Sequence, residues 1–234
     1  MARTRSNASE LALKKILKKI NSYDLSSGDV VSDLELSREF TMSRTPIREA
    51  ISRLIDAGVL ERTSTKVVVK TITLDDINEI LVVKEAIELM SVRLIIEEGG
   101  LSKSEEKSLL DLHETLKDDV SQGKFEDNFN TDAAFHSLIV SYSKNSRLLT
   151  INKQIDIQVQ RLRWITILTP SQFSITLDEH AAIIDAIRSK DLPMAETAIS
   201  KHSNSAKKNY ANIISNSHWS KLMKELSTMQ SIDE

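Results

Sequence analysis

The chain has 234 residues and no cysteine, which excludes a disulfide framework and a thiolate zinc finger. Its 40% hydrophobic and 28% charged residues are typical of a globular protein and exclude a disordered chain. No apolar run approaches the ~20 residues that a membrane helix needs, and the N-terminus lacks an apolar signal core, so we expect a cytoplasmic protein with no membrane partner. The net charge of -3 is uneven: residues 1–70 carry +4 and the remainder -7, which indicates a polyanionic partner for the first segment alone.

The first 60 residues show the spacing of three helices. Apolar residues recur at helical spacing over 13–20, with lysines between them that form either a solvated face or a set of phosphate contacts. A capping box at 32–35 opens a second, short helix. A third helix is expected over 43–57, and Gly58 supplies its left-handed C-cap. The tight link between the second and third helices predicts a helix-turn-helix.

The third helix separates apolar from basic residues. One face carries an apolar stripe, and the opposite face carries Arg44, Thr45, Arg48 and Ser52. Guanidinium forks near a helix N-terminus suit the reading of guanine edges and phosphates in the major groove of DNA. Two β-prone runs, 59–62 and 66–70, follow around a short turn and predict a hairpin. The order of these elements, a helix-turn-helix followed by a hairpin, predicts a winged helix.

Residues 36–54 resemble the DNA-binding signature of the GntR family of bacterial transcription regulators, through the run Ser43-Arg44-Thr45-Pro46-Ile47-Arg48-Glu49-Ala50. The resemblance implies DNA contacts by Arg38, Arg44 and Arg48, with Thr45 and Pro46 at the helix tip. Relatives usually carry glycine at the tip of the wing, where this chain has Ser64-Thr65-Lys66, so Lys66 is the expected contact there. Arg53 and Arg62 are interpreted as solvated surface residues.

From residue 73 onward the pattern predicts only helices. Six are expected, over 73–99, 102–123, 127–142, 145–168, 176–189 and 193–214. The fourth should end at Thr169-Pro170-Ser171. Helices joined by short links form an antiparallel bundle. The predicted fold class is therefore mainly α: a winged helix-turn-helix over 1–72, an antiparallel all-α bundle over 73–218 and a C-terminal tail over 219–234.

Asp132 and His136 lie four residues apart on the third of these helices, which places both side chains on one face. This spacing suits a divalent metal, although it also suits a plain surface ion pair. With His180 and His202 on later helices, the set resembles the ligand pattern of the helical FCD-type domain in the FadR branch of GntR regulators, in its six-helix VanR-like form. Three imidazoles and one carboxylate suit Zn, Ni, Co or Mn. His113 and His218 are expected on the surface.

The resemblance also implies a small organic-acid effector. A metal with open coordination positions in a cavity is likewise expected to bind a small carboxylate. Lys84 stands where many relatives place an arginine, and with Arg93, Arg161 and Arg163 it is a candidate effector contact; surface positions are the alternative for the three arginines. We expect a homodimeric repressor that binds a near-palindromic operator in double-stranded DNA.

Two alternatives remain open at this point. A metallohydrolase would use the same metal to activate water, but no second general base is evident, so we expect no enzyme. A regulator whose metal is structural, or is itself the signal, would need no carboxylate effector.

Overall fold

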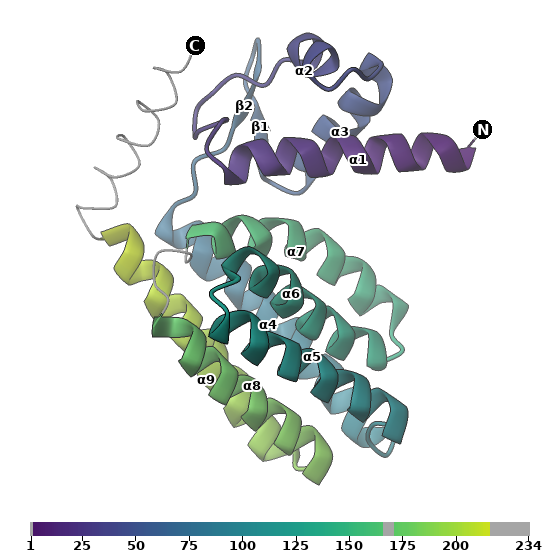
Figure 1. Cartoon of the computed structure of the whole chain (residues 1–234), viewed down its shortest axis with the longest axis vertical. Coiled ribbons are helices and arrows are strands. Elements are labelled where there is room, and N and C mark those ends of the chain that lie inside the picture. The colour runs from purple at the N-terminus through teal and green to yellow at the C-terminus, as the bar shows by residue number, and fades with distance from the viewer. Residues whose placement is uncertain (1, 166–170, 216–234) are drawn as a thin grey trace. The chain divides into compact units, whose positions relative to one another are not determined.

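The computed structural model describes residues 2–165 and 171–215 of the chain (Figure 1). These residues form two compact units, one built on residues up to Thr73 and the other on Leu74–Ile213. Within the described ranges, no helix is both long enough and apolar enough to cross a membrane.

The first unit has the helix-turn-helix and hairpin that its spacing predicts. Its elements are α1 (Ala2–Asn21), α2 (Asp33–Glu39), α3 (Arg44–Asp56), β1 (Leu60–Arg62) and β2 (Val67–Val69). Helix α1 packs on α3, and the buried side chains of Ile16, Ile47 and Leu54 fill the space around them. The two strands are antiparallel, with Leu60 opposite Val69.

The turn between α2 and α3 is held by local hydrogen bonds. The backbone N–H of Met42 donates to the carbonyl of Ser37 over 3.0 Å, and the Ser37 hydroxyl donates to the carbonyl of Met42 over 2.6 Å. Between them Thr41 adopts φ 53°, a left-handed conformation that a β-branched residue rarely takes. The expected C-cap also holds, since Gly58 follows α3 with φ 69°.

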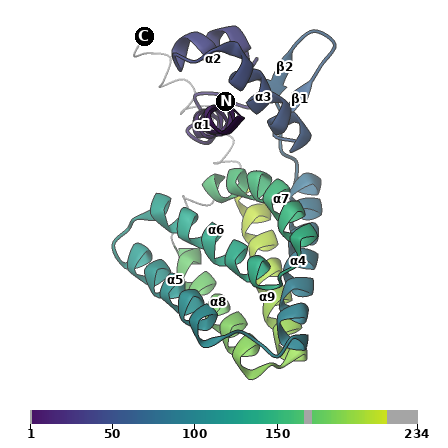
Figure 2. The same cartoon turned by 90° about the vertical axis from the view of Figure 1, so that its right-hand side faces the viewer.

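The second unit consists of six helices among the described residues: α4 (Leu74–Glu97), α5 (Lys103–Ser121), α6 (Phe125–Tyr142), α7 (Ser146–Ile165), α8 (Ser171–Ser189) and α9 (Leu192–Ser215). Helix α6 packs against α4, α5 and α7, and α8 packs against α5 (Figure 2). The side chains of Leu109, Phe135, Ile183 and Ile199 are fully buried in the core between these helices. The all-helical class predicted for this segment is confirmed.

Helix boundaries in this unit mostly follow the expected caps. Ser102 forms both hydrogen bonds of a capping box with Glu105, which starts α5. Helix α8 begins at Ser171, five residues before the expected start at 176. Its first turn is stabilised by Phe173, which is buried and whose ring centroid lies 6.0 Å from that of Phe129. The break expected at Thr169-Pro170 lies outside the described residues.

Candidate metal centre and nucleic-acid interface

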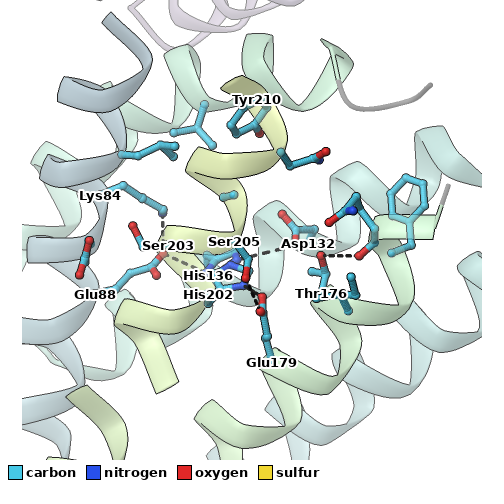
Figure 3. Close-up of a pocket in the computed structure, with 18 of the residues that line it drawn as sticks. Lys84, Glu88, Asp132, His136, Thr176, Glu179, His202, Ser203, Ser205 and Tyr210 are labelled. Carbon is cyan, nitrogen blue, oxygen red and sulfur yellow. Dashed lines mark hydrogen bonds and ion pairs between the residues drawn. The ribbon is translucent and has the colours of Figure 1, made fainter. Parts of the chain in front are cut away.

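Three histidines from three helices meet inside the second unit. His136 on α6, His180 on α8 and His202 on α9 each offer a ring nitrogen, and these atoms lie within 4.8 Å of one another. Figure 3 shows His136 and His202. His136 and His180 are buried, and His180 stacks on Phe135 with ring centroids 4.3 Å apart. Ligands on one first-row metal with bonds of about 2.1 Å lie within about 4 Å of each other. The cluster is therefore close to the size that one ion requires.

Asp132 faces the same cluster from one turn before His136. Its Oδ1 lies 3.5 Å from Nε2 of His180 and 3.7 Å from Nε2 of His136. These separations are longer than ordinary hydrogen bonds. The carboxylate and the two ring nitrogens thus border a common gap, where the fourth member of the expected ligand set would have to lie.

Two buried glutamates, which the sequence pattern does not single out, lie beside the Nδ1 atoms of two of the histidines. Oε1 of Glu88 on α4 lies 2.9 Å from Nδ1 of His136, and Oε2 of Glu179 on α8 lies 3.1 Å from Nδ1 of His202. Ser205 donates its hydroxyl to the other oxygen of Glu179 over 2.6 Å. A carboxylate on Nδ1 fixes the orientation of an imidazole and turns Nε2 toward a metal.

His180 provides the test of whether a cation fits. Within the part of the chain that the structure describes, neither of its ring nitrogens has a hydrogen-bond partner, although the side chain is fully buried. Burial, together with the nearby His202 and His136, lowers the pKa of His180 well below its ordinary value, so the ring is neutral. An unsatisfied buried polar atom costs about 1–3 kcal/mol. A metal ion accepting the lone pair of one nitrogen would remove part of that cost, so these residues fit a metal.

His136 has the opposite electrostatic environment. Burial disfavours its protonation, but the carboxylates of Glu88 and Asp132 outweigh burial and raise the pKa of His136 to about 9. The charge of His136 in turn helps to lower the pKa of Glu88, against the effect of burial. The pocket around these rings is therefore built to stabilise positive charge.

A cavity of about 120 Å³ opens beside the cluster between α4, α6, α7, α8 and α9 (Figure 3). By this measure one water needs about 10–15 Å³, so a small organic molecule can enter. Four carboxylates line the cavity: Glu85, Glu88, Asp132 and Glu179. Amide, hydroxyl and phenol groups line it as well, from Asn128, Gln172, Thr176, Ser203, Ser205, Asn209 and Tyr210.

The first unit presents most of the residues predicted to contact DNA. Arg38 on α2, Arg44, Thr45 and Arg48 on α3, and Lys66 before β2 are all exposed. Pro46 is buried, so its predicted place at the DNA-contacting tip needs correction: it packs inside the unit in the first turn of α3. Arg53 is exposed, as expected, and pairs with Glu10 over 2.8 Å.

Arg44 and Arg48 of α3 are bound by one carboxylate. Arg44 Nη2 lies 2.9 Å from Oδ2 of Asp33, the first residue of α2, and Arg48 Nε donates to the same oxygen. The hydrogen bond from Arg48 is the largest cause that lowers the pKa of Asp33. From the sequence, Asp33 is expected only as part of the capping box at 32–35.

Comparison with known families agrees with this architecture. Residues 9–68 match the family described as bacterial regulatory proteins, gntR family, and residues 79–205 match the FCD domain. The chain belongs to the GntR family and carries an FCD domain.

Relatives of this GntR regulator are transcription regulators. A probable D-xylose utilization operon transcriptional repressor of Paenarthrobacter nicotinovorans is 26% identical over 85% of this chain and 87% of its own length. The gluconate operon transcriptional repressor of Bacillus licheniformis is 26% identical over 71% of this chain and 70% of its own. The solved structure of E. coli McbR/YncC superposes with a TM-score of 0.73 at 20% identity, covering 88% of this chain and 97% of that one. The protein is therefore a DNA-binding transcription regulator rather than an enzyme.

Lys84 is the one predicted effector contact that lines the cavity of the FCD domain among the residues described. It is buried, and its Nζ lies 2.8 Å from Asn152 Oδ1, 2.9 Å from Asp156 Oδ1 and 3.2 Å from Glu88 Oε1. It donates hydrogen bonds to the first two of these oxygens and forms an ion pair with the third. A ligand that contacts this ammonium competes with these oxygens.

The other cationic candidates lie elsewhere. Arg93 is 44% exposed and pairs with Glu196 on α9 over 2.7 Å, outside the cavity. Arg161 is half-buried and is not among the cavity residues. The side chain of Arg163 lies outside the described residues. Long helical arginines tend to direct the charged end away from a bundle core, as that of Arg93 does.

One further histidine is placed differently from the expectation. His113 was expected on the surface, but it is buried on α5, with its Nε2 3.0 Å from the carbonyl oxygen of Leu177. The hydrogen bond to a backbone group of α8 accounts for its burial. His218 lies outside the described residues.

Proposed function

We propose that this regulator is a homodimeric repressor whose affinity for a near-palindromic operator is controlled by a small organic acid bound at a divalent metal in the FCD domain. The metal would be held by Asp132, His136, His180 and His202. The observation that carries the proposal is the buried His180, whose ring nitrogens have no hydrogen-bond partner among the described residues and lie beside two other imidazoles and a carboxylate.

The donor set indicates the kind of metal. Three imidazole nitrogens and one carboxylate oxygen suit Zn, Ni, Co or Mn. When bound, such an ion supplies a positive charge and open coordination positions that a small carboxylate can occupy. The chain's own contribution is to orient the ligands through Glu88 and Glu179, and to offer amide and hydroxyl groups of the cavity as hydrogen-bond partners.

Helix α4 is the proposed route from the cavity to the DNA-binding unit. It starts at Leu74, four residues after the hairpin, and it carries Glu88, which holds a ligand histidine, and Lys84, which ties α4 to α7. A ligand that shifts His136 therefore acts on the helix that is covalently joined to the winged helix. A coupling of about 1–3 kcal/mol would change operator affinity about 5- to 150-fold.

Dimer formation is proposed because one recognition helix reads too few base pairs for a specific site. The second unit leaves apolar side chains exposed on two helices that pack together. Val82 and Met90 on α4 are 55% and 43% exposed, and Ile151 on α7 is 44% exposed. A two-fold partner with the same surface would cover these side chains.

DNA contacts are proposed for Arg38, Arg44, Thr45, Arg48 and Lys66, all of which are exposed in the first unit. A guanidinium that reads a base contributes about 1–3 kcal/mol of discrimination. Unchanged operator binding by both Arg44→Ala and Arg48→Ala would contradict this assignment.

The function is tested by calorimetry on the full chain before and after metal removal. The metal-loaded protein should bind a member of a panel of small mono- and dicarboxylates, and the stripped protein should lose that binding while it remains folded. Loss of the fold with the metal would show a structural ion instead. Operator affinity that follows metal concentration with no acid present would show that the metal itself is the signal.

A further inference from the structure

The carboxylate of Asp33 contacts Arg44 and Arg48 of α3 in different ways. Arg44 presents the side of its guanidinium: Nε lies 3.3 Å from Oδ2, and Nη2 lies 3.0 Å from Oδ1 and 2.9 Å from Oδ2. Arg48 donates to Oδ2 through Nε alone. The same carboxylate therefore occupies one complete fork of Arg44 but only the inner nitrogen of Arg48.

We propose that Asp33 is a positioning residue that gives Arg44 and Arg48 different roles in DNA recognition. Arg48 keeps both terminal nitrogens, which form the fork that matches O6 and N7 of guanine, so it reads a base. Arg44 has its Nε–Nη2 fork engaged and keeps Nη1, which suits a contact to a phosphate. This inference rests on the proposed function, because it assumes that these arginines meet DNA.

Asp33 can fix the positions of the two guanidinium groups in the protein that has not yet bound DNA. It is the first residue of α2, its side chain is 23% exposed, and the arginines are 49% and 63% exposed. A long exposed side chain loses conformational freedom when it binds, and an arginine whose inner nitrogen is already fixed has less to lose. The carboxylate of Asp33 thus favours one geometry of the Arg48 fork.

The negative charge of Asp33 also acts on binding to DNA of any sequence. Binding without sequence preference comes from neutralised phosphates, and a carboxylate beside two guanidinium groups weakens that attraction. Asp33 should therefore raise the ratio of specific to non-specific affinity in two ways. It favours the base contact, and it opposes contacts to the backbone.

The test compares four variants on two DNA duplexes. The first duplex is selected from a random pool by the wild-type protein, and the second is a scrambled version of it. Asp33→Asn should bind the scrambled duplex more tightly and lower the specific-to-scrambled ratio about tenfold. Arg48→Lys, which keeps the charge but loses the fork, should lower the same ratio by about tenfold or more. Arg44→Ala should weaken both duplexes alike and reduce the salt slope by about 0.9.

Glu61→Gln is the matched control, since it removes one exposed negative charge from the same unit without touching either arginine. It should leave the ratio unchanged. A wild-type ratio in Asp33→Asn alongside a lowered ratio in Arg48→Lys would overturn the role of Asp33 and leave the DNA-binding face intact. A ratio lowered by Arg44→Ala but not by Arg48→Lys would overturn the division of work. Wild-type binding by both arginine variants would overturn the proposed DNA contacts themselves.

Discussion

Replacing Glu179 with glutamine tests how the candidate metal centre orients one of its histidines. Glu179 is buried, and its two oxygens contact His202 and Ser205 over 3.1 and 2.6 Å. Glutamine keeps the shape but removes the charge that holds Nδ1 of the imidazole. Loss of such a partner lowers metal affinity by about 10- to 100-fold, which is about 1.4 to 2.7 kcal/mol.

The size of the effect on thermal unfolding follows from the size of the unit. At a free metal concentration 100 times the dissociation constant, binding adds about 2.7 kcal/mol to the free energy of unfolding. A unit of ~140 residues has an unfolding entropy of about 0.3 kcal/mol/K, so zinc should raise the melting temperature of the wild-type FCD unit by about 9 °C. The Glu179→Gln variant at the same zinc concentration should gain only about 1 to 5 °C.

Differential scanning calorimetry of the full chain, with and without zinc, measures both shifts, and titration calorimetry gives the affinities directly. Glu196→Gln on α9 is the matched control, because Glu196 is exposed and pairs with Arg93 away from the cluster. It should keep the wild-type shift. A Glu179→Gln variant with undiminished zinc affinity would refute the orienting role, and a wild-type protein without any zinc-dependent shift would refute the metal centre.

Two other predictions concern ion pairs elsewhere in the chain. Lys84→Met leaves the buried Glu88 and the partly buried Asp156 without their cation and should lower the free energy of unfolding by about 3–5 kcal/mol, as read from chemical denaturation. Exposed Lys107→Met should change it little, and equal effects would contradict the importance of burial. For Asp33, the hydrogen bond from Arg48 holds the pKa below the ordinary 3.8, so the stabilisation is present above pH 3.8 and lost as pH falls through the lower folded-state value. Carboxyl NMR titration should show this low pKa in the wild type and a rise toward 3.8 in Arg48→Ala; an identical pKa in both would contradict the pair.

Asp132 and His136 could be anticipated from helical spacing, which places them on one face, whereas His180 and His202 were expected only through the resemblance to the FCD-type ligand pattern. Asp132 and His136 are one turn apart, and the single histidines of the last two helices complete the cluster. Glu88 and Glu179 could not be anticipated in this way, since a glutamate on a helix ordinarily lies on the surface. One signal was present: Lys84 and Glu88 stand one turn apart at the helical spacing of the buried apolar residues Leu81 and Ile95.

Other departures from expectation arise from contacts between segments distant in sequence. His113 is buried because its ring Nε2 pairs with the carbonyl oxygen of Leu177 on α8 over 3.0 Å. Helix α8 begins early because Phe173 packs against Phe129 of α6. Neither partner can be identified from local spacing, whereas the helix-turn-helix depends on caps and turns within a few residues, which is why its boundaries were predicted closely.

The four carboxylates around the cavity have a consequence for how the regulator would respond to its surroundings. Without a metal, Glu85, Glu88, Asp132 and Glu179 outnumber the cationic Lys84 and His136 that line the same cavity, so the lining as a whole disfavours an anionic ligand. Under the proposed mechanism an organic acid could therefore enter only when the ion is already in place. The protein would act as a coincidence detector: neither abundant acid in metal-starved cells nor abundant metal without the acid would change the transcription of its target genes.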